Sequence, residues 1–197
     1  MKIDAAIFDI GNVLLLFDYL KAANRLIEKN RPAVPPDREK IVAANRMFEL
    51  GRSTRAEFLT AVRAEFCDSG DEEEFVHTWS NIFVENLPMT SLARRLSARM
   101  PVYLLSNIGE IHHGFIFQSF DVFSIFRDGV YSYRAGCMKP SAEIFEIATG
   151  QFSVTPASTL YFDDLPENCA AAEAAGFRAH YYEPHREDLP GAWNIPL

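Results

Sequence analysis

Two hydrophobic patterns divide the chain. From residue 18 to residue 85 apolar residues recur at helical spacing, which predicts four helices, at 18–30, 37–50, 54–67 and 71–85, and no strand. After Pro88 short apolar runs alternate with helical segments. We expect helices at 88–100, 110–119, 141–152 and 166–175, strands ending at 106 and 162, a strand at 178–182, and a short apolar piece at 122–126. Strands that alternate with helices form parallel sheets.

The helical stretch interrupts an α/β unit after its first strand, an apolar run that ends at Phe8. We predict a parallel sheet with helices on both faces, built from residues 1–16 and 88–197, and an all-helical cap built from residues 17–87. Helix boundaries support this division. Thr54 and Glu57 have the spacing of a capping box, in which each side chain bonds the other residue's free amide.

Polar residues stand at the ends of three predicted strands: Asp9, Ser106, and the pair Asp163 and Asp164. Lys139 lies in a loop that contains glycine. Because ligands bind beyond the carboxyl ends of parallel strands, we expect these side chains to meet. Three carboxylates, a hydroxyl and an ammonium predict a site for a divalent cation and a phosphate.

Composition narrows the class of partner. The formal net charge of -8 and the pI near 5.1 argue against a nucleic-acid backbone as ligand, since that affinity comes from clustered Lys and Arg. No apolar run approaches the roughly 20 residues of a membrane span, and no leader segment is evident, so we expect a cytoplasmic protein. Cys67, Cys137 and Cys169 lack metal-ligand or disulfide spacing and are interpreted as free, packed thiols.

The four motifs, in this order and with the helical insert, resemble the haloacid dehalogenase (HAD) superfamily, subfamily IA with a helical C1 cap. Phe-Asp-Ile-Gly-Asn-Val-Leu from Phe8, Leu-Ser-Asn, Met-Lys-Pro and Phe-Asp-Asp are similar to the motifs of bacterial α-D-glucose-1-phosphate phosphatases. The resemblance implies a Rossmann-like core and a Mg²⁺-dependent phosphatase. Its substrates would be small phosphorylated metabolites, and sugar phosphates such as glucose 1-phosphate come first.

The resemblance also implies catalytic and metal-binding roles. Asp9 would attack phosphorus and form an aspartyl-phosphate, a covalent intermediate that divides one difficult step into two. Lys139 would contact the phosphate and keep Asp9 ionised. Asp9, the backbone carbonyl of Gly11, and Asp163 or Asp164 would bind Mg²⁺. Asp164 is expected to be the direct ligand, and Asp163 to act through water or to orient Lys139.

Further residues would bind the phosphate or support the site. The hydroxyl of Ser106 and the backbone amides of Ile10 and Asn107 would contact phosphate oxygens, together with Lys139. Asn168, one helical turn after the acidic pair, would support it.

The sequence departs from the family pattern at Gly11, where phosphatases of this superfamily carry a second Asp that protonates the leaving group. Such groups typically contribute about 10²–10⁴-fold in rate. Three interpretations remain open. The substrate has a leaving group that needs little protonation, another residue supplies the proton, or the protein is a catalytically impaired binding protein. His112 and His113 are candidate acids, since His titrates near neutral pH. The resemblance to the glucose-1-phosphatases includes a His a few residues after the Ser-Asn, which favours His112.

A metal-independent 2-haloacid dehalogenase is a further alternative, but the adjacent Asp163 and Asp164 argue against it. The remaining histidines are interpreted as structural or surface residues: His77, His180 and His185. Several residues of the insert are candidates for the mouth or wall of a sugar pocket, although surface and packing roles are more common for such residues: Phe17, Asp18, Tyr19, Arg46, Arg52 and Trp79. We expect a monomer or a homodimer.

Overall fold

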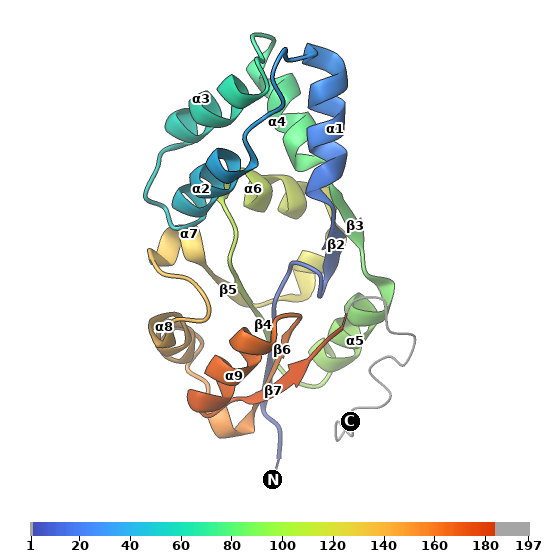
Figure 1. Cartoon of the computed structure of the whole chain (residues 1–197). Coiled ribbons are helices and arrows are strands. Elements are labelled where there is room, and N and C mark those ends of the chain that lie inside the picture. Colours follow the sequence, from blue (N-terminus) through green and yellow to red (C-terminus); the bar gives the residue numbers. More distant parts are fainter. Residues whose placement is uncertain (1, 184–197) are drawn as a thin grey trace.

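The core of the protein is a five-stranded sheet in the order β5-β4-β1-β6-β7, and every neighbouring pair is parallel. This architecture comes from a computed structural model that describes residues 2–183. The strands are β1 (Ala5–Phe8), β4 (Val102–Ser106), β5 (Asp128–Tyr131), β6 (Thr159–Asp163) and β7 (Arg178–Tyr181). The prediction of a parallel α/β sheet is confirmed (Figure 1).

Helices cover both faces of the sheet because strand side chains alternate between the faces. Ala6 and Phe8 pack in one cluster with residues of α5 and α6, whereas Ala5 and Ile7 pack in a second cluster with residues of α8 and α9. These helices are α5 (Leu87–Ser97), α6 (Glu110–Ser119), α8 (Ala142–Phe152) and α9 (Pro166–Ala174). β1 is buried on both sides, as its uninterrupted apolar sequence predicts.

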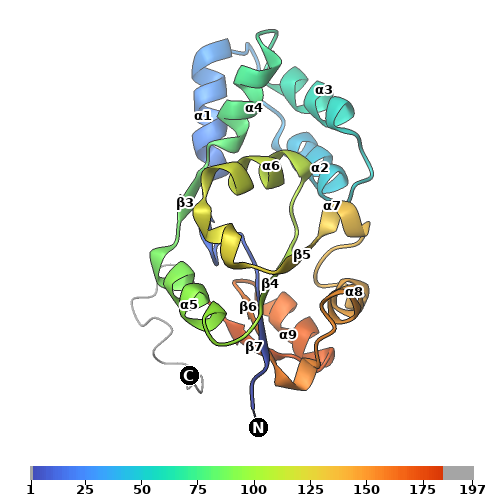
Figure 2. The same ribbon diagram turned by 180° about the vertical axis from the view of Figure 1, so that it is seen from behind.

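The predicted cap helices form a separate group at one end of the molecule (Figures 1 and 2). They are α1 (Tyr19–Asn30), α2 (Arg38–Glu49), α3 (Arg55–Glu65) and α4 (Glu72–Ser80). Their own apolar cluster contains Phe58, Phe75 and Trp79, and Ile111 of α6 joins it from the core. The capping box of Thr54 and Glu57 is present.

Two short strands lie where the insert leaves the core. β2 (Leu15–Phe17) pairs antiparallel with β3 (Phe83–Glu85). The predicted helix at 71–85 is therefore wrong beyond Ser80, where α4 ends, and the expectation of no strand between residues 18 and 85 is wrong because β3 lies there. Three-residue strands are too short to give a periodic signal, and they form because the chain leaves and re-enters the core side by side. The boundary at 17–87 stays a prediction.

The sequence also failed to predict β5. The apolar piece near residues 122–126 forms the 3-10 helix η1 (Asp121–Ile125), and the edge strand follows it. A short helix, α7 (Ser132–Ala135), comes next, and η2 (Pro156–Ser158) precedes β6. β5 escaped prediction because its first residue is exposed and its second is half-buried, so that the apolar run contains two residues.

Three smaller predictions have clear outcomes. The cysteines are free thiols, but Cys67 is exposed, so a packing role is wrong for that residue; Cys137 and Cys169 are buried. Within residues 2–183, the helices are too short and too polar to span a membrane. His185 lies outside the described residues.

Candidate active site

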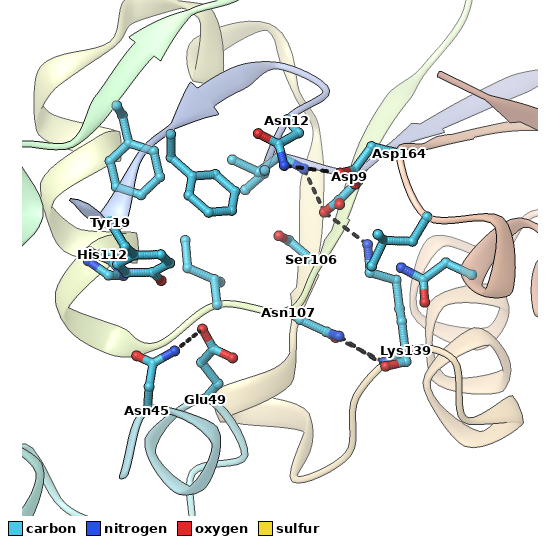
Figure 3. Close-up of a pocket in the computed structure, with 17 residues that line it drawn as sticks. Asp9, Asn12, Tyr19, Asn45, Glu49, Ser106, Asn107, His112, Lys139 and Asp164 are labelled. Atoms are coloured by element: carbon cyan, nitrogen blue, oxygen red, sulfur yellow. Dashed lines mark hydrogen bonds and ion pairs between the residues drawn. The ribbon is translucent and has the colours of Figure 1, made fainter. Parts of the chain in front are cut away.

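A cavity of about 340 Å³ lies between the carboxyl edge of the sheet and the cap helices (Figure 3). The four sequence motifs converge on it. Their residues on its wall are Asp9, Ile10, Gly11, Ser106, Asn107, Lys139, Asp164 and Asn168. Parallel strands bring them together, since β1, β4 and β6 are neighbours and end at the same edge.

Asp9 and Lys139 form a buried ion pair at the end of β1. The Lys139 Nζ lies 2.9 Å from Asp9 Oδ1, and the backbone N–H of Ile10 donates to the same oxygen at 2.7 Å. Burial raises the pKa of the Asp9 carboxyl to about 7; Lys139 opposes the shift, and the charge of Asp163 adds to it. The pKa of Lys139 is also raised, because the carboxylates Asp163 and Asp9 outweigh the effect of its burial. Lys139 therefore stays charged.

Asp163 is fully buried, and both of its oxygens accept hydrogen bonds. Lys139 Nζ donates to Oδ2 at 2.7 Å, and the hydroxyl of Tyr161 donates to the same oxygen. Oδ1 accepts from Asn168 Nδ2 at 2.8 Å and from the backbone N–H of Leu165 at 3.0 Å. Burial raises the pKa of Asp163, but Lys139 and the hydrogen-bond donors lower it by more, so the net shift is downward. Asp163 is thus an ionised group that positions Lys139.

Asp164 is held by a residue that the sequence did not single out. Asn12 Nδ2 donates to Asp164 Oδ2 at 3.1 Å. Asn12 has a φ of 54°, a left-handed conformation that Asn tolerates better than most residues, and it lies in the turn after Asp9. In the sequence, Asn12 could have been noticed as the polar residue that interrupts the apolar run from Ile10 to Leu16.

The acidic residues fit a hard divalent cation. Ligand oxygens of Asp9, Asp163 and Asp164 all lie within 4.8 Å of one another, and carboxylate oxygens are the ligands that Mg²⁺ prefers. Three carboxylates face one ammonium, that of Lys139, so the site carries an excess of negative charge that a cation would offset. Burial raises the pKa of Asp164, and the charge of Asp163 adds to the rise, whereas the hydrogen bond from Asn12 opposes it.

Asn107 has a contact that sequence reasoning missed. Its side chain donates to the backbone carbonyl of Lys139 at 3.0 Å and accepts from the backbone N–H of Lys139 at 2.9 Å. This reciprocal pair attaches the loop that carries Lys139 to the end of β4. These two hydrogen bonds hold the loop in place, because Lys139 lies outside the strands of the sheet.

Gly11 leaves no free space for the missing acid. A Cβ atom built on Gly11 would lie 2.9 Å from Cε1 of Phe17, closer than carbon atoms normally approach. The ring of Phe17 therefore occupies the place into which an Asp side chain at position 11 would point.

The two candidate histidines differ in position. His112 lines the cavity but packs among the rings of Tyr19, Trp79 and Phe83, and His113 packs against Tyr131. Burial lowers the pKa of His112 to about 4, against the opposing effect of the Trp79 carbonyl. Burial also lowers the pKa of His113 to about 4. At neutral pH both rings are uncharged, which disfavours either as a proton donor.

The cap contributes a different set of residues from the one expected. Phe17 and Tyr19 line the cavity, as predicted for its mouth, whereas Asp18 caps α1 by accepting from the backbone N–H of Leu20. The other expected residues are absent from the described cavity wall: Arg46, Arg52 and Trp79. Trp79 is instead buried inside the cap. The polar cap residues on the wall are Asn45 and Glu49 of α2.

Solved structures of HAD enzymes share this fold. A HAD family enzyme from Bacteroides thetaiotaomicron, crystallised as a magnesium complex, is 23% identical with a TM-score of 0.85, covering 99% of this chain and 100% of that chain. The same enzyme has been crystallised with magnesium and inorganic phosphate. An L-2-haloacid dehalogenase from Xanthobacter autotrophicus, with chloropropionic acid covalently bound, is 16% identical with a TM-score of 0.64, covering 91% of this chain and 77% of that one.

Similarity in sequence points the same way. A sesquiterpene phosphatase from Aspergillus oryzae is 34% identical over 98 residues, a match that spans 45% of this chain and 45% of that protein. Residues 3–176 match the family of haloacid dehalogenase-like hydrolases. The chain belongs to the haloacid dehalogenase-like hydrolases.

Proposed function

We propose that this hydrolase is a Mg²⁺-dependent phosphatase of small phosphorylated metabolites that works through an aspartyl-phosphate on Asp9. One observation carries the proposal: Asp9, at the end of β1, lies 2.9 Å from the buried ammonium of Lys139 and within reach of the oxygens of Asp163 and Asp164. A nucleophilic carboxylate, a fixed positive charge and a cation site in one cavity are what phosphoryl transfer requires.

In the first step the carboxylate of Asp9 attacks phosphorus. A bond forms between Asp9 and phosphorus, and the bond from phosphorus to the leaving-group oxygen breaks, with its electron pair leaving on that oxygen. Lys139 and the hydroxyl of Ser106 stabilise the charge on the phosphoryl oxygens. The leaving group takes a proton from solvent. Water then attacks phosphorus: a bond from the water oxygen to phosphorus forms, the bond between Asp9 and phosphorus breaks with its electron pair returning to the carboxylate, and the proton lost by the water passes to solvent as phosphate leaves.

We assign the cation ligands from the contacts of each carboxylate. Asp9, Asp164 and the backbone carbonyl of Gly11 would hold Mg²⁺ directly, because the oxygens of Asp163 already accept four hydrogen bonds. The cation would neutralise charge on the transferred phosphoryl group. Asn12 would keep Asp164 in a ligating position, and Asn168 would hold Asp163 where it positions Lys139.

The substrate we place first is a sugar phosphate such as glucose 1-phosphate. An anomeric oxygen leaves more readily than a simple alkoxide, so the absence of an acid at Gly11 slows such a substrate less. The hydrogen-bonding groups of Asn45 and Glu49 on the cavity wall support a hydroxylated leaving group.

An apolar phosphate ester is a second candidate substrate. A groove of about 620 Å³ between α1 and α2 adjoins the cavity, since Phe17, Tyr19 and Asn45 line both. Its other walls include Leu20, Ile27 and Val42, and the sequence relative is named a sesquiterpene phosphatase. In that case the hydrocarbon would lie in the groove.

The test is phosphate release with and without Mg²⁺ from glucose 1-phosphate, glucose 6-phosphate, farnesyl phosphate, acetyl phosphate and p-nitrophenyl phosphate. We expect Mg²⁺-dependent release, highest for glucose 1-phosphate among the sugar phosphates. Stopping the reaction in acid should trap phosphate on Asp9.

Three results would contradict the proposal in different ways. Release that persists without Mg²⁺ would exclude the metal mechanism. Mg²⁺ and ligand binding without release would identify a binding protein. Release of halide from a 2-haloacid, without phosphate release, would identify a dehalogenase.

A further inference from the structure

The cavity contains one acidic side chain that the proposed mechanism does not use. Glu49 is the last residue of α2, and Asn45, one helical turn earlier, donates from Nδ2 to Glu49 Oε1 at 2.8 Å. Residues four apart lie on the same helix face, so both side chains point into the cavity. Figure 3 shows them at the end of the cavity opposite Asp9 and Asp164.

The negative charge of Glu49 is poorly compensated by other groups of the protein. Among residues 2–183, no Lys or Arg nitrogen lies within salt-bridge distance of its carboxylate. Burial raises its pKa to about 7, against the lowering effects of Asn45 and Arg46 on the same helix. Tyr19 of α1 interacts with it from a neighbouring element, and burial and the charge of Glu49 raise the pKa of Tyr19. The neutral His112 of α6 lines the same cavity.

Glu49 is half-buried, and donors on a ligand would stabilise its carboxylate. Burying a charge without a partner is costly, and the cost falls when hydrogen-bond donors approach it. The hydrogen bond from Asn45 leaves Oε2 able to accept from a ligand in the cavity. The cavity wall also includes the rings of Phe17, Tyr19 and Phe83, which suit the apolar face of a sugar ring.

We propose that Glu49, positioned by Asn45, binds hydroxyl groups of the leaving group and thereby selects a polyhydroxylated phosphate ester. This inference rests on the proposed phosphatase function. Asp9 and Lys139 hold the phosphate at one end of the cavity, and Glu49 binds the hydroxyl groups of the leaving group at the other end. It is a specificity residue and not the missing acid, because it lies at the far end from the bond that breaks.

The decisive experiment compares Glu49→Gln with the wild-type full chain in the presence of Mg²⁺. Gln keeps the size of the side chain but removes its negative charge. We expect KM for glucose 1-phosphate to rise about 10-fold or more, as for the loss of a hydrogen bond to a charged group, while kcat changes little. The kinetic constants for p-nitrophenyl phosphate, which has no hydroxyl groups, should stay within about 2-fold.

Two controls isolate the effect. Glu28→Gln removes an exposed carboxylate from α1 and should leave every constant unchanged. Calorimetric binding of glucose 1-phosphate to Asp9→Asn, with and without Glu49→Gln, needs no turnover. It therefore tests the role of Glu49 even when the phosphatase proposal fails, and we expect the second substitution to weaken binding about 10-fold.

Five results would overturn the inference. Equal losses for all substrates would show a structural role, and unchanged constants and affinities would show no role. A fall in kcat that grows with the pKa of the leaving group would make Glu49 the acid. A selective loss for O-phosphoethanolamine would show that Glu49 binds an ammonium, and a wild-type preference for farnesyl phosphate over glucose 1-phosphate would place the leaving group in the apolar groove.

Discussion

The two ends of the cavity are built in different ways. On the core side, Asp9, Lys139 and Asp163 are each buried and share ion pairs and hydrogen bonds that leave little freedom. On the cap side, Glu49 is held by a hydrogen bond from Asn45 and keeps a pKa near 7. The comparison indicates that several buried contacts fix the groups on the core side, whereas Glu49 on the cap side has fewer contacts within the protein.

The largest effect is expected when a substitution removes the nucleophile on the core side of the cavity. Asp9→Asn should lower phosphate release by at least about 10³-fold with every substrate, because no covalent intermediate forms. Initial rates of phosphate release measure the loss. Asp4→Asn, an exposed carboxylate just before β1, is the matched control and should retain full activity. Substantial turnover by Asp9→Asn would refute the nucleophile assignment.

The second effect concerns the stability of the core side. Lys139→Met leaves Asp163 buried without its cation, which should destabilise the fold by about 3–5 kcal/mol in urea unfolding. Arg55→Met breaks the exposed ion pairs with Glu72 and Glu73 in the cap and should cost less than about 1 kcal/mol. Similar losses of stability for the two variants would show that ion pairs on the core side are no more important for stability than ion pairs in the cap.

The third effect tests the space at Gly11. Gly11→Asp should cost about 1–3 kcal/mol of stability, because its Cβ meets the ring of Phe17. The double variant with Phe17→Ala should be more stable, by at least about 1 kcal/mol, than the sum of the two single losses of stability predicts. In the double variant, kcat for simple alkyl phosphates should rise about 10-fold as the proton donor is restored. Strict additivity of the unfolding energies would show that the ring is no obstacle.

The smallest effect is a pH dependence on the cap side. The pKa of Glu49 is raised from 4.5 to about 7 in the fold, so the folded protein binds the proton more tightly than the unfolded chain. Its contribution to stability therefore falls as pH rises from about 4.5 to about 7 and is constant above that.

Glu49→Gln lacks this dependence. Its stability relative to the wild type should increase by about 1 kcal/mol between pH 4 and pH 8, since solvent screens part of the effect. Urea unfolding across that range measures the difference, and Glu28→Gln should follow the wild type. A difference that stays constant with pH would contradict the raised pKa.

Prediction from sequence succeeded where a strong local pattern exists. The buried strands β1, β4 and β6 have uninterrupted apolar runs, and the polar residues at their ends identified one side of the cavity. It failed at β2, β3 and β5, which are short or partly exposed. Asn12 and Glu49 were missed for a related reason. Each is one polar residue among many, and the sequence does not show what lies opposite.

Local periodicity and the order of motifs along the chain were enough to predict the α/β class, the helical insert and the set of motif residues. Tertiary structure alone decided which cap residues face Asp9, that the ring of Phe17 fills the space beside Gly11, and that burial makes His112 a poor acid. These properties depend on distances between segments far apart in the chain and on their exclusion of water, which no local pattern encodes.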